Sequence, residues 1–516
     1  MAKMMNLSLD MHNARDDNKD HYIKLTLDIP HHAPNQKQKT IFAYSDISGS
    51  MSDQCRDGRT KQQHINHTWT NLLHFLAEHP EFNVSIELEG FEENLREVIP
   101  LTKVTDTNVE KLAKEVNKMR PMGCTNIEQA LRDMVEKCSA SSSTRNYSLI
   151  MTDGEPTDGE LCTDKLAEIV PRESRFAAIA FGIEHNAVLM YKLGTRGMNT
   201  TNWLVTDLER SALVYAEILT KWMYQVLDDV TITIRNGRLY DYLTNTWVST
   251  LSMGALSAEE KKYIHVKSET PEMVEVEVRG VVIDTETSIV EAIAMKENIV
   301  PKGVVVDLTR DIYRLRVQEL LYQAMTLPRE TDPEGPNVFN VLRATHNRVP
   351  FTCLKPPRLV RQKNELWDIN MLQEQMLDVE VEAEAIEKEK AAAAAAAAEN
   401  NKNQINNLKN RINELKDVIQ AYMKEQGLEE DAFLAGLVAD MNVAYNKIGT
   451  AHQRMFITAL NASQGRQQSQ AIDDTEEEEE LQDNHMPKSK RSHINAAYAS
   501  PLVIKTIRSM STPPST

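Results

Sequence analysis

Short apolar runs alternate with helical patterns between residues 41 and 226, and this alternation most constrains the fold. Four runs have the length of buried strands: 41–44, 84–88, 147–151 and 176–181. The first intervening segment repeats apolar residues on one helical face: Ile65, Trp69, Leu72 and Leu76. Strands that alternate with helices form a mostly parallel sheet covered on both faces. The sequence therefore predicts an α/β domain over residues 41–226.

Three short polar segments lie beside these predicted elements. Asp46-Ile47-Ser48-Gly49-Ser50 follows the first strand, Thr152-Asp153-Gly154 follows the third, and Gly123-Cys124-Thr125 precedes a helical pattern. The carboxyl ends of parallel strands share one edge of a sheet, and ligands bind there. Carboxylate and hydroxyl oxygens suit Mg²⁺, which takes oxygen ligands at roughly 2.0–2.1 Å. We predict one divalent-cation site built from the three loops.

This set of polar residues resembles the metal-ion-dependent adhesion site of von Willebrand factor type A (vWA) domains, and the resemblance covers roughly residues 20–226. Five positions match the pattern Asp-x-Ser-x-Ser, Thr, Asp: Asp46, Ser48, Ser50, Thr125 and Asp153. The resemblance implies a Rossmann-like fold in which the hydroxyl groups bind Mg²⁺ or Mn²⁺ directly and the two aspartates bind it directly or through water. It also implies one open coordination position, which a Glu or Asp of a partner protein fills.

Other candidate site residues carry weaker signals. His64 and His67 lie three residues apart on a predicted helix, but zinc sites need three or four ligands, so we interpret both as surface histidines. Asp53 resembles the acidic residues that flank the adhesion site in integrins, but one acid is weak support, and we interpret it as a solvated turn residue. Cys124 precedes a helix start, where a thiol can be oxidation-sensitive, but we expect a packed small side chain instead. The sequence contains no phosphate-binding Gly-x-x-x-x-Gly-Lys-Ser/Thr motif and no evident nucleophile, so we expect no catalysis.

The segments outside 41–226 predict a small β-sandwich and a helical region. Residues 1–20 are polar and expected to be disordered, and the pattern of 21–40 predicts a strand and a linker that we assign to the sandwich. Alternating Val and Ile residues predict short antiparallel strands over 228–306. Helical patterns cover 308–465, with a coiled-coil-like segment at about 366–425.

The apolar seam of that segment repeats at spacings of three and four: Ile405, Leu408, Ile412, Leu415, Ile419 and Tyr422. Two arrangements fit it, an antiparallel helical hairpin that turns at Gly427, or self-association of two chains. Residues 466–516 are expected to be a disordered tail with an acidic run at 473–480 and a basic cluster at 488–491. The cluster is either a nuclear import signal or a solvated charge run. Within the tail, the apolar segment 500–504 is a candidate for docking back on the folded part.

The net charge and the cysteines restrict the classes of partner and the cellular compartment that we expect. The net charge of −18 argues against nucleic acid and anionic membranes, both of which require clustered Lys and Arg. The five cysteines are scattered, as expected in a reducing compartment. We find no signal peptide and no apolar stretch of membrane-spanning length, so we expect an intracellular, cytoplasmic protein, with the nucleus as an alternative.

These expectations favour an intracellular, non-enzymatic interaction or scaffold protein that binds an acidic partner loop through Mg²⁺. The alternative of another class is a subunit of a ubiquitin-ligase-like or other enzyme complex. A third is a structural assembly protein that uses the coiled coil.

Overall fold

The computed structural model describes most of the chain, and the structural statements below concern only the described residues. These are 4–15, 20–55, 58–141, 145–153, 155–182, 185–197, 199–205, 212–295, 306–327, 369–468, 470–473, 492–495 and 498–511. Residues 328–368 of the predicted helical region, the basic cluster 488–491 and nearly all of the acidic run 473–480 lie outside them.

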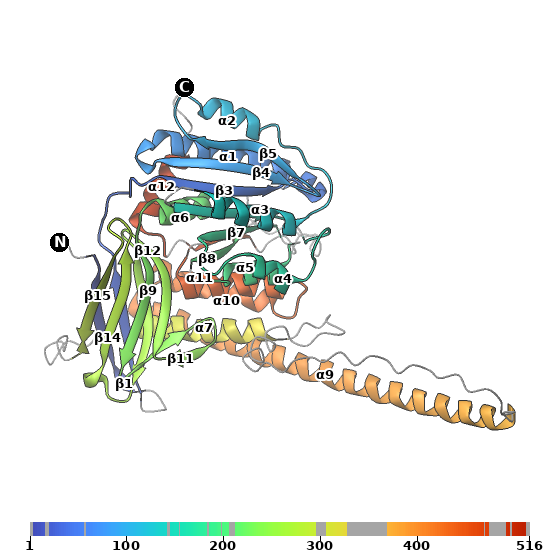
Figure 1. Cartoon of the computed structure of the whole chain (residues 1–516). Helices are drawn as coiled ribbons and strands as arrows, with labels where there is room; N and C mark the ends of the chain where they lie inside the picture. Colours follow the sequence, from blue (N-terminus) through green and yellow to red (C-terminus); the bar gives the residue numbers. More distant parts are fainter. Residues whose placement is uncertain are drawn as a thin grey trace, which may run out of the picture.

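A mostly parallel sheet forms the centre of the molecule (Figure 1). In spatial order its strands are β17 (Ser492–Asn495), β16 (Gln470–Asp473), β8 (Thr200–Val205), β7 (Phe176–Phe181), β6 (Arg145–Thr152), β3 (Lys39–Asp46), β4 (Val84–Phe91) and β5 (Leu95–Lys103). All neighbours from β16 to β4 pair in parallel, whereas β17 and β5 run antiparallel at the two edges.

Helices cover both faces of this sheet. Successive side chains of a strand point to opposite faces, so Ile41 and Ala43 join one apolar cluster while Phe42 and Tyr44 join the other. The first cluster contains residues of α1 (Lys61–Glu78), α2 (Val109–Val116) and α6 (Ala212–Met223). The second contains residues of α3 (Ile127–Ala140), α4 (Thr163–Ile169) and α5 (Ala187–Gly194). Both faces of the sheet are therefore buried, which explains the continuous apolar runs in the sequence. The predicted α/β fold is confirmed.

A β-sandwich lies beside the central sheet (Figure 1). One layer contains β1 (Asn6–Arg15), β2 (His21–Asp28), β13 (Lys261–Ser268), β10 (Arg238–Asp241) and β11 (Thr246–Val248). The other contains β12 (Thr250–Ser257), β9 (Gln225–Arg235), β14 (Glu275–Val282) and β15 (Thr287–Ala294). The part of the central α/β domain from β3 to α6 is thus inserted between β2 and β9.

The expectation that residues 1–20 are disordered is wrong for Asn6–Arg15. This segment forms β1, which pairs antiparallel with β2 and buries Leu9. Its polar composition hides the signal, because one face of an edge strand needs only a few apolar residues to join a core. In turn, β2 pairs with β13, so the N-terminal strands belong to the sandwich.

In the described parts of the predicted helical region, four helices are present: α7 (Thr309–Thr326), α9 (Ile369–Gln426), α10 (Ala432–Lys447) and α11 (Gln453–Arg466). Gly427, with φ of +64°, follows α9, and Asp431 caps α10 through its carboxylate. The seam residues Ile405, Leu408, Ile412 and Ile419 are buried in one cluster with α7, α10 and α11. The seam is therefore covered within the chain, while the other half of α9 projects from the body (Figure 1).

The expectation of a disordered tail over 466–516 is wrong for three segments. β16 extends the central sheet beside β8, β17 pairs with β16, and α12 (Pro501–Ser511) packs on α6 and α1. Leu502 and Val503 are buried in α12, as the apolar segment 500–504 suggested. The strands are only four residues long, too short for a period-2 pattern to be recognised.

Candidate functional site

The carboxyl edge of the central sheet brings two of the predicted loops together. Asp46 is the last residue of β3, and Asp153 directly follows β6. Because β3 and β6 are adjacent and parallel, both aspartates lie at the same edge. Ser48 and Ser50 follow β3 at the start of a 3-10 turn, Gly49–Ser52.

The Asp46 carboxylate is fully buried and oriented by hydrogen bonds. The Ser48 backbone N–H donates to its Oδ1 at 2.8 Å, and the Thr152 hydroxyl donates to its Oδ2 at 2.6 Å. Burial raises the pKa of the Asp46 carboxyl to about 6, and the charge of Asp153 adds to this, while the hydrogen bonds from Ser48 and Thr152 oppose it. A cation beside Asp46 would favour the charged form.

Ser48, Ser50 and Asp153 form a continuous set of oxygen contacts. The hydroxyls of Ser48 and Ser50 lie 3.1 Å apart, and the Ser50 hydroxyl donates to Asp153 Oδ1 at 2.7 Å. The set offers carboxylate and hydroxyl oxygens and no sulfur or imidazole ligand, so its chemistry fits a hard divalent cation. Four of the five predicted ligands are therefore brought together through direct contacts around Asp46.

Thr125 is positioned through the backbone of its loop. Its N–H donates to the Thr157 hydroxyl at 2.9 Å, and its carbonyl accepts the N–H groups of Thr157 and Asp158. The preceding Gly123 accepts the N–H of Gly49 at 3.2 Å, which joins the loop to the serine segment. Gly123 has φ of +68°, and a Cβ there would collide with Glu92.

The sequence analysis missed Lys61, the first residue of α1. Its ammonium group donates to Asp153 Oδ2 at 2.8 Å and to Asp53 Oδ2 at 3.1 Å. Asp53, which we interpreted as a solvated turn residue, is therefore ion-paired, although 54% of its side chain is exposed. One signal was available: a lysine in the first turn of a helix is unfavourable with the helix dipole and needs nearby anions.

The weaker candidates do not assemble into a second site. His64 is buried and His67 is exposed on α1, so our interpretation of both as surface histidines is wrong for His64. Among the described residues, no cluster of three or more His, Cys, Asp or Glu side chains is placed to hold a metal ion. Cys124 is exposed as a free thiol, which contradicts the expectation of a packed side chain, because the loop turns its side chain to solvent.

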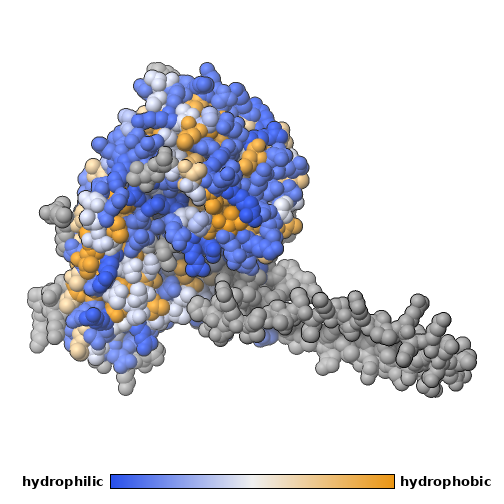
Figure 2. Space-filling view, in the orientation of Figure 1, coloured by the Kyte–Doolittle hydropathy of each residue, from blue (hydrophilic) through white to orange (hydrophobic). Residues whose placement is uncertain are grey.

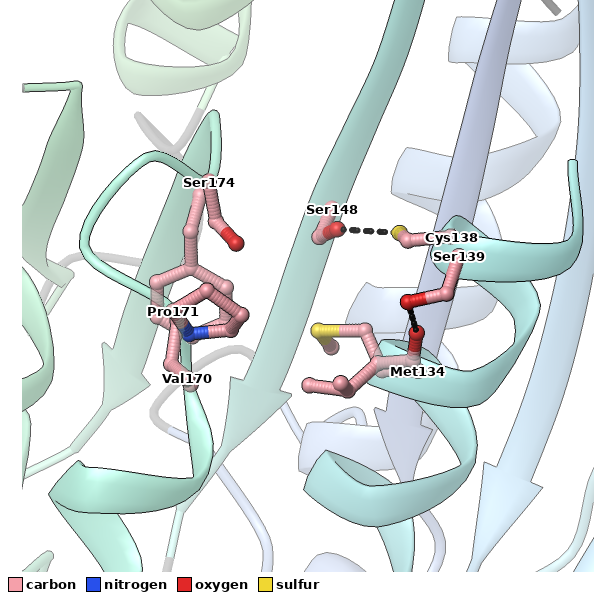
Figure 3. Close-up of a pocket in the computed structure, with 9 residues that line it drawn as sticks. Met134, Cys138, Ser139, Ser148, Val170, Pro171 and Ser174 are labelled. Carbon is pink, nitrogen blue, oxygen red and sulfur yellow. Dashed lines mark hydrogen bonds between the residues drawn. The ribbon is translucent and has the colours of Figure 1, made fainter.

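A cavity of about 140 Å³ lies at the opposite end of the sheet, between α3 and the amino ends of β6 and β7 (Figure 3). Its lining is apolar apart from three serines and one thiol: Met134, Val135, Cys138, Ser139, Ser148, Val170, Pro171, Ser174 and Phe176. The Cys138 thiol and the Ser148 hydroxyl are 3.1 Å apart, and burial raises the pKa of Cys138. The thiol is thus kept protonated, which does not suit a nucleophile.

Residues 41–216 match the family model of the von Willebrand factor type A domain. This part of the chain is a vWA domain, a class that generally mediates protein–protein interaction. No curated protein matches the sequence.

Several solved structures are similar to the chain. A von Willebrand factor type A protein from Catenulispora acidiphila is 12% identical, with a TM-score of 0.42, over 62% of this chain and 81% of that chain. The ArnB paralog VWA2 from Sulfolobus acidocaldarius is 12% identical, with a TM-score of 0.45, over 90% of this chain and 99% of that chain. The PilB minor pilin from Streptococcus sanguinis is 14% identical, with a TM-score of 0.31, over 42% and 77%.

Within the described part of the chain, no helix has the length and hydrophobicity needed to cross a membrane.

Proposed function

We propose that the vWA domain captures an acidic residue of a protein partner through Mg²⁺ or Mn²⁺. Ser48, Ser50 and Thr125 would contribute hydroxyl ligands, and Asp46 and Asp153 would contribute the two carboxylates. When bound, the ion supplies an electrophilic centre on which a partner Glu or Asp replaces a water molecule. The role is binding, and we propose no catalytic step.

The observation that carries this proposal is the contact chain from Asp46 through Ser48 and Ser50 to Asp153. Each hydroxyl lies within hydrogen-bond distance of the next oxygen, at 3.1 and 2.7 Å. Loops from two strands thus hold the donor oxygens before any ion binds, which reduces the entropy lost on binding. The buried Asp46, fixed by Ser48 and Thr152, keeps the first loop in place.

The surface supports recognition through charge more than through apolar area. On the face drawn in Figure 2, hydrophilic side chains predominate over the vWA domain and the hydrophobic ones form small separate groups. A partner that bound there by apolar contact would need a larger continuous patch. A metal-bound carboxylate supplies a strong local contact on such a surface.

The helical region supports a scaffold role. Helix α9 extends for 58 residues, and its N-terminal half projects from the body (Figure 1). We propose that this arm joins the vWA domain to a larger intracellular assembly. Among the described residues, the free thiols of Cys124, Cys138 and Cys162 are compatible with a reducing compartment.

The test is a pull-down of partners with excess Mg²⁺ or with EDTA, repeated with Thr125→Ala. The hydrogen bonds that hold Thr125 to Thr157 and Asp158 use its backbone, which alanine retains, so we expect the unfolding free energy to change by less than about 1 kcal/mol. Partner binding should fall at least about tenfold, because a neutral ligand is lost. Thr107→Ala, at an exposed threonine of another loop, is the control.

Equal capture in Mg²⁺ and EDTA would show that the adhesion-type mechanism is wrong even though the domain is a vWA fold. A parallel loss of stability and binding in Thr125→Ala would instead indicate a metal that only holds the loops together.

A further inference from the structure

Lys61 places a permanent positive charge on one of the proposed metal ligands. Its Nζ lies 2.8 Å from Asp153 Oδ2, the oxygen that Ser50 does not contact, and only 14% of the lysine side chain is exposed. The Asp153 side chain is fully buried. A divalent ion at this site and the lysine ammonium group would therefore compete for the same carboxylate of Asp153.

The position of Lys61 in α1 shows that this contact is not an incidental surface pair. Lys61 is the first residue of the helix, directly after the Thr60 cap, where the helix dipole disfavours a cation. Burial of the side chain also disfavours the charged form, yet the hydrogen bond and charge of Asp153, aided by Asp53, raise the pKa of Lys61 overall. The carboxylates thus hold an ammonium group where helix and burial oppose it.

Asp53 gives Lys61 a second anchor outside the ligand set. The ammonium lies 3.1 Å from Asp53 Oδ2, and this carboxylate is half exposed. Asp46 and Asp153 together balance one divalent ion, and Asp53 then balances Lys61. The local charges stay balanced if Lys61 releases Asp153 when the ion binds and retains its ion pair with Asp53.

We propose that Lys61 is a built-in competitor of the divalent cation at Asp153 and sets the metal concentration at which the site loads. This inference rests on the proposed metal-dependent function. Metal binding must break the charge-assisted hydrogen bond between Lys61 and the buried Asp153 carboxylate, and this cost weakens the measured metal affinity. The fraction of sites that hold a metal ion, and with it partner binding, would then vary with the free metal concentration.

The test measures Mg²⁺ and Mn²⁺ binding by isothermal titration calorimetry for the wild type, Lys61→Met, Lys61→Arg and Lys165→Met. Lys61→Met keeps the length of the side chain and removes the competing charge, so its Kd should fall about tenfold. Lys61→Arg keeps the charge and should keep the wild-type affinity within about threefold.

Lys165→Met is the matched control. Lys165 lies on α4 and pairs with Glu160, in the loop that follows Asp153, at 2.8 Å, with 69% of its side chain exposed. The Lys165→Met variant therefore removes one positive charge, as Lys61→Met does, but from a lysine that pairs with Glu160 and not with Asp153. Its Kd should stay within about twofold of wild type, since exposed charges are strongly screened.

Thermal melts in EDTA supply a second measurement that needs no metal. Lys61→Met should melt lower than the wild type in EDTA, because the buried Asp153 carboxylate loses its cation, and it should gain more from added Mg²⁺. Together with the tighter Kd, this pattern supports the proposal.

Three outcomes would overturn it. A Kd for Lys61→Met within twofold of wild type would show that Lys61 does not compete, while the metal-dependent function stands. An affinity gain equal to that of Lys165→Met would reduce the effect to general electrostatics. Absence of Mg²⁺ and Mn²⁺ binding in the wild type and in every variant would remove the proposed function, and the competition with it.

Discussion

The two ends of the vWA sheet hold different kinds of side chains, although the same strands and the same helix α3 connect them. At the carboxyl edge, Asp46, Asp153 and Lys61 place three charged groups within a few hydrogen bonds of one another. At the amino edge, the cavity beside Cys138 is small, mostly apolar and lined by no charged residue. Parallel strands and helix starts concentrate donors at one edge, so one end is suited to binding and the other to packing.

The largest expected effect is at the carboxyl edge. Asp46→Ala removes one of two charged ligands, so Mg²⁺ affinity should fall more than about 100-fold in calorimetry. Asp106→Ala, at an exposed carboxylate of the loop between β5 and α2, should leave the affinity unchanged. Unchanged Mg²⁺ affinity in Asp46→Ala would mean that the ligands were assigned wrongly.

The amino edge should respond in the opposite way. Met134 lines the cavity and is 2% exposed, so Met134→Ala enlarges an existing hole and should cost about 3 kcal/mol of unfolding free energy. Its Mg²⁺ affinity should match wild type. Chemical denaturation checks the first point, with the 40% exposed Met122→Ala as the control. A weakened metal affinity would show that α3 couples the two ends.

A buried histidine near the carboxyl edge predicts an acid sensitivity. Burial lowers the pKa of His185 to about 4, reinforced by His452 and opposed by the contact of its Nδ1 with the Gly182 carbonyl. The unfolded value is about 6.5, so the unfolded chain binds more protons between these pH values. The stabilisation is complete above about pH 6.5 and is lost as pH falls towards 4.

His185→Gln should remove this dependence. In the wild type, the group contributes a loss of about 2 kcal/mol between pH 8 and pH 5. Glutamine has no titrating proton and keeps a donor for the Gly182 carbonyl, so the variant's denaturation curve should move less with pH. His31→Gln, at a side chain that is 70% exposed, serves as the control. Identical pH slopes for His185→Gln and wild type would exclude His185 as the source.

The smallest expected effect is at the cavity thiol. Cys138→Ser replaces the sulfur beside Ser148 with a smaller hydroxyl and should change unfolding free energy by about 1 kcal/mol or less. Metal affinity should not change. A clear change in Mg²⁺ titrations of this variant would contradict the separation of the two ends.

The parts of the site that the sequence predicts are those governed by strand geometry. Asp46 and Asp153 each follow an apolar run, and parallel pairing of those runs is enough to place them together. Lys61 is different, because its contact with Asp153 spans 92 residues and depends on how the 3-10 turn leads into α1. No local pattern encodes that distance.

The fold shows the same division. The central strands can be recognised from the sequence because both of their faces are apolar. In contrast, β1 pairs with β2 and β16 with β8 mainly through backbone hydrogen bonds, which any residues can make. Gly427 and Asp431 mark the turn between α9 and α10 with local signals, so that turn was predictable. The packing partners of the α9 seam were not, because an apolar stripe does not say which surface covers it.

The place of β16 late in the chain, beside the much earlier β8, also governs the order of events during synthesis. β16 pairs with β8, and the adjoining Gln468 donates to the Asn202 carbonyl, 266 residues earlier in the chain. The edge of β8 therefore stays open while the sandwich and the helical region leave the ribosome. Open strand edges invite pairing with other chains. The nascent protein thus has a period of aggregation risk that lasts until β16 has been synthesised and can pair with β8.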